Sequence, residues 1–124
     1  TRGIAEIARL GVAMGCNIHT FAGLAGIGDL IVTATSMHSR NNRAGILIGK
    51  GKSPEQAVKE VGMAVEGINA LPAAMELAAK YNVEMPIVQT VNAIVKEGMS
   101  ASDALRTLMD RNRKNEMPQG YEKV

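Results

Sequence analysis

Apolar positions recur along the chain at the spacing of a helix face. The first set repeats at i, i+3, i+4 and i+7, a pattern typical of an amphipathic helix. Its members are Ile4, Ile7, Ala8, Gly11 and Met14. This helix is expected to end at Gly15. It is already in progress at Thr1, which no N-cap precedes, so we expect the chain to be part of something longer.

Capping signals mark the starts of further helices. Ser53 is followed by Pro54 and Gln56, which combines a serine cap, a proline at the first helical position and a reciprocal glutamine. Pro86 opens another helix, and Ser100 caps the last one. The predicted segments are a turn at 21–24 capped by Thr20 and helices at 27–35, 39–49, 54–61, 65–81 with a kink at Pro72, 86–98 and 100–109.

The fold class follows from this periodicity. No stretch of about four to eight residues alternates between apolar and polar positions, as a half-buried strand would. We therefore predict an all-α fold, a single helical domain of about seven helices over residues 1–110. From Arg111 the apolar rhythm stops, and residues 111–124 are predicted to form a flexible, solvated tail.

The composition supports helices and limits the size of the domain. Of the 124 residues, 46% are hydrophobic, yet they include only two Tyr, one Phe and no Trp. Such aliphatic, alanine-rich content favours helices over a sheet. An enzyme with a dinucleotide cofactor usually has a nucleotide-binding domain and a substrate domain, and a chain of this length holds only one of them.

Charge and cysteine content argue against several classes of protein. The formal net charge of +2 gives no case for a nucleic-acid or membrane-surface partner. No apolar run approaches the roughly 18 residues of a spanning helix, and no signal sequence is expected. Cys16 is the only cysteine, so no internal disulfide forms, and we expect a cytoplasmic location.

Basic residues gather in one part of the chain. No acidic residue lies between Asp29 and Glu55, whereas four cations do, namely Arg40, Arg43, Lys50 and Lys52. A solvated basic face is one interpretation. The other is an anion site, because Ser39, Arg40 and Asn41 stand at a predicted helix start, where free backbone N–H groups and the helix dipole favour a phosphate.

A glycine-rich segment precedes Asp29. The order of glycines in residues 23–29 is the reverse of the dinucleotide-binding fingerprint, and a helix rather than a strand comes before it. We interpret the small residues as allowing close packing or close approach of a ligand. Asp29 itself is either a helix cap or an acid that orients a catalytic group or a substrate hydroxyl.

Other chemistries have little support. Cys16 and His19 are a lone pair of metal-ligand types, so no metal site is predicted. His38 and Ser39 are adjacent, so they do not face each other on a helix as a hydrolase dyad would. By pattern alone, Glu66 is an ordinary acid in the first turn of a helix.

The motifs taken in order resemble the C-terminal domain of bacterial NAD(P)-dependent glycerol-3-phosphate dehydrogenase, over Thr1 to about Glu116. The segments that carry the resemblance are 20–30 (T-F-A-G-L-A-G-I-G-D-L), Thr33, Ser39-Arg40-Asn41, Val65-Glu66-Gly67 and Met85-Pro86-Ile87. The resemblance implies a fold like that of the C-terminal domain of 6-phosphogluconate-dehydrogenase-like enzymes. One departure is Ala34, where relatives often carry Cys, and no role depends on it.

The resemblance implies a substrate site. Ser39, Arg40 and Asn41 would bind the phosphate of glycerol 3-phosphate or dihydroxyacetone phosphate. Asp29 would lie beside the catalytic lysine and the reacting carbon, with Thr33 one helical turn further on. That lysine belongs before Asp29, and no lysine of this chain stands there.

The resemblance also implies a cofactor, NAD or NADP, which Arg40, Ala64 and Glu66 would contact. The reaction would be hydride transfer between the nicotinamide ring and C2 of the substrate, with the lysine as acid and base. The nucleotide-binding (Rossmann) domain of the family would be a further partner. We expect this chain alone to be inactive and the parent enzyme to serve glycerophospholipid synthesis, with self-association into a homodimer.

One alternative from a different class is a freestanding helical binding or dimerisation module without catalysis. Preference for NAD or NADP is decided by the nucleotide-binding domain, outside this sequence.

Overall fold

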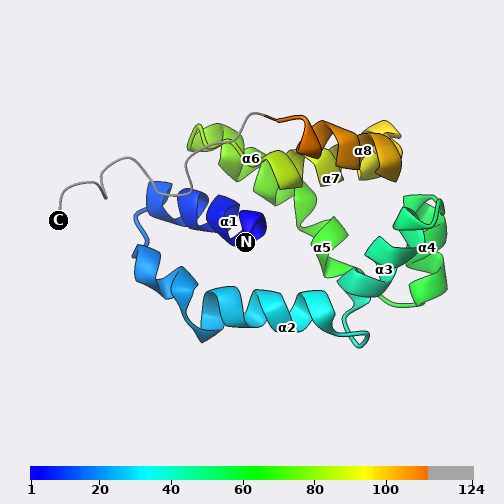
Figure 1. The fold of residues 1–124 in the computed structure, drawn as a ribbon, viewed down its shortest axis with the longest axis horizontal. Coiled ribbons are helices and arrows are strands. Elements are labelled where there is room, and N and C mark those ends of the chain that lie inside the picture. Colours follow the sequence, from blue (N-terminus) through cyan, green and yellow to red (C-terminus); the bar gives the residue numbers. More distant parts are fainter. Residues whose placement is uncertain (112–124) are drawn as a thin grey trace.

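The computed structural model describes residues 1–111, and every regular element in that range is helical (Figure 1). The all-α prediction is confirmed. Residues 112–124, most of the predicted tail, lie outside the described part. The elements are α1 (Arg2–Ala13), a 3₁₀ turn (Ile18–Ala22), a π turn (Leu24–Gly28), α2 (Asp29–Thr35), α3 (Arg40–Gly49), α4 (Pro54–Val61), α5 (Glu66–Asn69), α6 (Leu71–Lys80), α7 (Pro86–Glu97) and α8 (Ala101–Met109).

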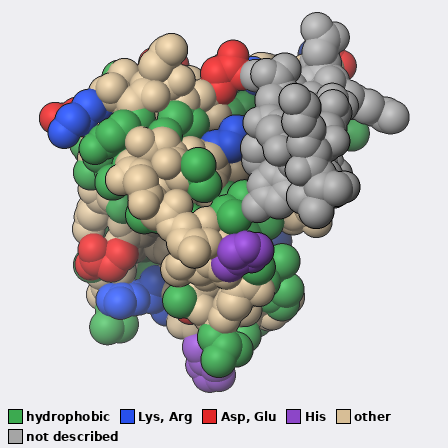
Figure 2. Space-filling model, turned by 90° about the vertical axis from the view of Figure 1, so that its left-hand side faces the viewer, with side chains coloured by type: hydrophobic (Ala, Val, Ile, Leu, Met, Phe, Trp, Pro, Cys, Tyr) green, Lys and Arg blue, Asp and Glu red, His purple; other side chains and the backbone are tan. Residues whose placement is uncertain are grey.

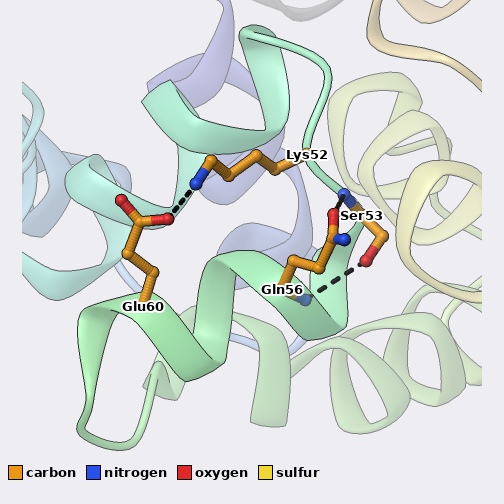
Figure 3. A network of polar contacts seen from close by, with 4 residues as sticks. All are labelled: Lys52, Ser53, Gln56 and Glu60. Carbon is orange, nitrogen blue, oxygen red and sulfur yellow. Dashed lines mark hydrogen bonds and ion pairs between the residues drawn. The ribbon is translucent and has the colours of Figure 1, made fainter.

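Serine side chains cap three helix starts, two of which, at Ser53 and Ser100, were predicted. The hydroxyls of Ser39, Ser53 and Ser100 each accept a hydrogen bond from the backbone N–H three residues on. At α4 the Gln56 side chain also accepts from the Ser53 N–H, which completes a capping box (Figure 3). The starts of these three helices are therefore decided by local sequence.

Two predicted segments differ from the structure. The helix predicted at 65–81 is divided into α5 and α6, because Pro72 lacks the N–H that would bond back to Ile68 and its ring crowds that carbonyl. The turn near residue 20 is capped by Asn17, whose side chain accepts from the His19 N–H at 2.9 Å, and not by Thr20. Asn17 is the cap because it directly precedes the 3₁₀ turn, where its side-chain oxygen can accept a hydrogen bond from the first turn.

The helices pack around a core that consists mostly of alanine side chains. α3 contacts α4, α7 contacts both α6 and α8, and α5 lies against α3. Figure 1 shows α6, α7 and α8 along one side of the molecule and α2 along the opposite side. The buried apolar side chains are Ala44, Ala57, Val65, Leu71, Ala78, Met85, Ala93 and Ala104.

A buried carboxylate joins the first helix to the seventh. Glu6 of α1 is only 3% exposed. Its two oxygens accept from the backbone N–H of Ile87 at 2.6 Å and of Val88 at 3.4 Å. Since Met85, the N-cap of α7, provides no side-chain cap, Glu6 replaces it from another helix.

α2 is poorly buried. None of its residues is buried, and Ile31 and Val32 are more than half exposed. Figure 2 shows apolar side chains reaching the surface among charged ones. None of the helices within residues 1–111 is both long and apolar enough to cross a membrane.

Candidate functional site

The glycine-rich segment forms a π turn that leads directly into α2. A methyl group at Gly26 would lie 2.2 Å from the carbonyl oxygen and 2.5 Å from the Cα of Phe21. Because both atoms are backbone, only glycine fits at this position. Single π turns within helices are frequent at functional sites. Here the turn sets the direction in which α2 starts at Asp29.

The ring of Phe21 ties this turn to α1. A methyl group at Gly11 would lie 2.1 Å from the Cζ of Phe21 and 2.5 Å from its Cε2. The ring therefore rests on the backbone of α1. At the other end of α1, Leu30 of α2 comes near Gly3, with its Cδ2 3.8 Å from a methyl group placed there. Gly11, which was predicted to lie on the apolar face of the first helix, and Gly3, for which nothing was predicted, thus help to place Asp29.

Asp29 and Thr33 lie on one face of α2, four residues apart. Asp29 is exposed and Thr33 is half-buried. Within the described part of the chain neither side chain makes a hydrogen bond or ion pair. The Asp29 carboxylate therefore retains its full capacity to accept hydrogen bonds from a group outside this chain.

Ser39 and Arg40 form the start of α3. The Ser39 hydroxyl oxygen accepts from the Asn42 N–H at 3.2 Å. The Asn42 amide in turn donates to the Ser36 carbonyl at 3.0 Å, which closes the loop before the helix. Arg40 is half-buried and has no acidic partner among residues 1–111. A cation at a helix start, where the dipole is also positive, leaves this end of α3 without a counterion.

Not all of the basic segment contributes to this end. Lys52 forms an ion pair with Glu60 across the α3–α4 turn, as Figure 3 shows. Arg43, on the same face of α3 as Arg40, is half-buried, and its Nε is buried without a partner. Lys50 is exposed at the other end of α3. Of this basic segment, Lys52 is therefore neutralised by an ion pair, whereas Arg40 and Arg43 form no ion pair within residues 1–111.

Asn41 brings a second motif to the start of α3. Its Oδ1 accepts from the backbone N–H of Gly67 at 2.9 Å, across 26 residues of sequence. Gly67 follows Glu66, the first residue of α5, and Val65 before it is buried. The buried valine and this hydrogen bond hold the segment, while Glu66 and Ala64 stay exposed.

The structure therefore joins two of the three predicted groups. The phosphate segment and the Glu66 segment are directly linked, whereas no hydrogen bond or ion pair among the described residues connects Asp29 or Thr33 with either. No cluster of three or more His, Cys, Asp and Glu within residues 1–111 could hold a metal ion. Gly67 stands in the Val65-Glu66-Gly67 motif, but no role was predicted for it, although glycine in the first turn of a helix, where it is unfavourable, is a usable signal.

Comparison with known proteins gives a consistent result. Residues 1–106 match the family described as NAD-dependent glycerol-3-phosphate dehydrogenase C-terminus. A glycerol-3-phosphate dehydrogenase (NAD(P)+) from Lactobacillus delbrueckii subsp. bulgaricus is 65% identical over 116 residues, which cover 94% of this chain and 34% of that protein. One from Thermoanaerobacter sp. is 56% identical over 117 residues, which cover 94% of this chain and 36% of that protein.

A solved structure agrees with the sequence matches. The crystal structure of glycerol-3-phosphate dehydrogenase from Coxiella burnetii superimposes with a TM-score of 0.85 at 36% identity, and the match covers 89% of this chain and 34% of that one. The chain thus spans about a third of the length of the relatives it matches.

Proposed function

Because the chain belongs to the family of NAD-dependent glycerol-3-phosphate dehydrogenase C-terminal domains, we propose that it is the substrate-binding domain of an enzyme that interconverts sn-glycerol 3-phosphate and dihydroxyacetone phosphate. The observation that carries the proposal is the start of α3. There Arg40, which has no acidic partner in the described part of the chain, stands beside Asn41, which is hydrogen-bonded to the Glu66 segment. The family membership favours this function over a freestanding binding or dimerisation module.

The substrate phosphate is assigned to Ser39, Arg40 and Asn41. The Arg40 guanidinium can hold two phosphate oxygens at once, and the free N–H groups of the first helical turn add donors. The Ser39 oxygen already accepts a hydrogen bond, but its hydroxyl proton remains free to donate. Together these groups would fix the charged end of the substrate and so position its C2.

The reacting end of the substrate is assigned to Asp29 and Thr33. An exposed carboxylate that has no partner within residues 1–111 can accept a hydrogen bond from the lysine ammonium of the rest of the enzyme and orient it. Thr33, one turn further along α2, provides a hydroxyl on the same face. Since the lysine lies outside this chain, we expect no activity from the domain by itself.

The cofactor is assigned to Glu66, Ala64 and Arg40. The residues fit it, because Glu66 offers an exposed acceptor for amide or hydroxyl donors and Ala64 an exposed small side chain. When bound, NAD or NADP exchanges a hydride with C2 of the substrate. The cation of Arg40 can neutralise phosphate charge nearby.

The proposal extends to the setting of the enzyme. We place it in the cytoplasm, as a homodimer that supplies glycerol 3-phosphate for glycerophospholipid synthesis. The nucleotide-binding domain that precedes this one in the family would be its covalent partner. Net charge of +2 gives no reason to expect a nucleic-acid or membrane partner.

The test is the Arg40→Ala variant of the full-length enzyme that carries this domain. Loss of a charge-assisted contact costs about 1.5–3 kcal/mol, so kcat/KM for dihydroxyacetone phosphate should fall roughly 10- to 150-fold. Lys50→Ala is the matched control, since it removes an exposed cation from the other end of α3. If both variants keep the same kcat/KM, the phosphate assignment is wrong.

A further inference from the structure

The amide of Asn41 has its orientation imposed by Gly67. Its Oδ1 accepts from the Gly67 N–H at 2.9 Å. The Nδ2 group consequently points away from that N–H, because oxygen and nitrogen occupy opposite ends of the amide. Asn41 is exposed, and its Nδ2 makes no hydrogen bond to any residue within 1–111. Both N–H donors of the Asn41 amide therefore have a fixed direction and no acceptor within residues 1–111.

We propose that Gly67 is a positioning residue for the substrate phosphate. Its backbone N–H holds the Asn41 carbonyl, and its lack of a side chain leaves room for the amide, so that the two Asn41 donors face the phosphate. The inference rests on the proposed function. It adds a residue that contacts neither substrate nor cofactor and acts through Asn41.

Space, not backbone conformation, requires glycine at this position. A methyl group there would lie 2.9 Å from the Cγ of Asn41 and 3.0 Å from both its Nδ2 and its Oδ1. Gly67 is not among the glycines with positive φ, so alanine could adopt its backbone conformation. Alanine would also favour the helix by about 1 kcal/mol. The amide of Asn41 lies across the space that the missing side chain leaves.

The Asn41 side chain is the group that a methyl group at Gly67 would meet, and this predicts the effect of Gly67→Ala. Asn41 is an exposed side chain on the first turn of α3, so an added methyl group would turn its amide aside rather than disrupt the fold. The hydrogen bond to Gly67 would then break, and the donors would lose their direction. Buried Val65 would still hold the Glu66 segment after this bond is lost, so cofactor contacts should change little.

The experiment uses the full-length enzyme with Gly67→Ala. We expect the KM for dihydroxyacetone phosphate and the inhibition constant of inorganic phosphate to rise together, by about tenfold for one charge-assisted hydrogen bond. The KM for NADH or NADPH should change by less than about twofold, because Glu66 keeps its place. Gly45→Ala on α3 is the control, because a methyl group there meets nothing within 4 Å.

A double variant separates positioning from a general structural effect. Asn41→Ala removes the amide without adding bulk, and it gives a result even if Gly67→Ala folds poorly. If Gly67 acts only through Asn41, adding Gly67→Ala to Asn41→Ala changes phosphate inhibition no further.

Two outcomes overturn the inference. One is that Gly67→Ala behaves like Gly45→Ala, and the other is that its effect persists in full in the Asn41→Ala background. Failure of the inference is distinguishable from failure of the proposed function. If only the inference about Gly67 is wrong, Arg40→Ala still lowers kcat/KM for dihydroxyacetone phosphate. If the proposed function is wrong, Arg40→Ala leaves this kcat/KM unchanged.

Discussion

At the scale of single residues, close backbone approach decides the geometry around Asp29. Phe21 is held between Gly11, which receives its ring, and Gly26, which lies against its backbone. Neither glycine has positive φ, so the reason for glycine at both places is space. The first helix and the start of α2 are therefore connected through a single aromatic residue.

This arrangement predicts that Gly26→Ala destabilises the domain. Its methyl group would meet backbone atoms of Phe21 at 2.2–2.6 Å, which forces the π turn apart. We expect a loss of about 2–3 kcal/mol in the free energy of unfolding, measured by urea denaturation. Gly28→Ala is the matched control in the same turn, because its nearest neighbours lie at 3.5 and 3.6 Å. Equal stability of the two variants would refute this account of the turn.

At the scale of the elements, the helices depend on contacts from other helices as well as on their own caps. α4 is capped within its own sequence, by Ser53 and Gln56. α7 takes its cap from Glu6, 81 residues before Ile87. This carboxylate satisfies donors that the start of a helix otherwise leaves open to water or unpaired.

The remote cap predicts that Glu6→Ala weakens the link between α1 and α7. Removing a buried, charged acceptor of two backbone N–H groups should cost about 1.5–3 kcal/mol in the free energy of unfolding. Hydrogen exchange at the Ile87 and Val88 amides should accelerate as well. Glu97→Ala, which removes an exposed acid at the other end of α7, should stay within about 0.5 kcal/mol of the parent chain. A Glu6 variant as stable as the Glu97 variant would show that the cap contributes nothing.

The sequence predicted those features that depend on neighbouring residues. Helical periodicity and the serine caps at Ser53 and Ser100 are local, and the structure confirms them. The cap by Glu6 and the Asn41–Gly67 bond were not predictable, because they join residues that only the tertiary fold brings together. The roles of the site residues came from a resemblance of motifs and remain predictions.

At the scale of the whole molecule, three side chains of the proposed site have no ionic partner in the described part of the domain. Asp29, Arg40 and Glu66 make no ion pair within residues 1–111. The chain spans about a third of the length of its relatives. An acid, a cation and an acceptor left without partners in this way are suited to receive a lysine, a phosphate and a cofactor from outside the domain. This division of labour is the central claim of the proposed function.

The most direct test is the oxidation of NADH and NADPH by the full-length enzyme, with dihydroxyacetone phosphate or dihydroxyacetone as substrate. The phosphate contacts proposed at α3 predict turnover of dihydroxyacetone phosphate, with a kcat/KM at least about 100-fold above that for dihydroxyacetone. The proposed function would be contradicted by equal values of kcat/KM for the two substrates. It would also be contradicted if dihydroxyacetone phosphate caused no oxidation of NADH or NADPH.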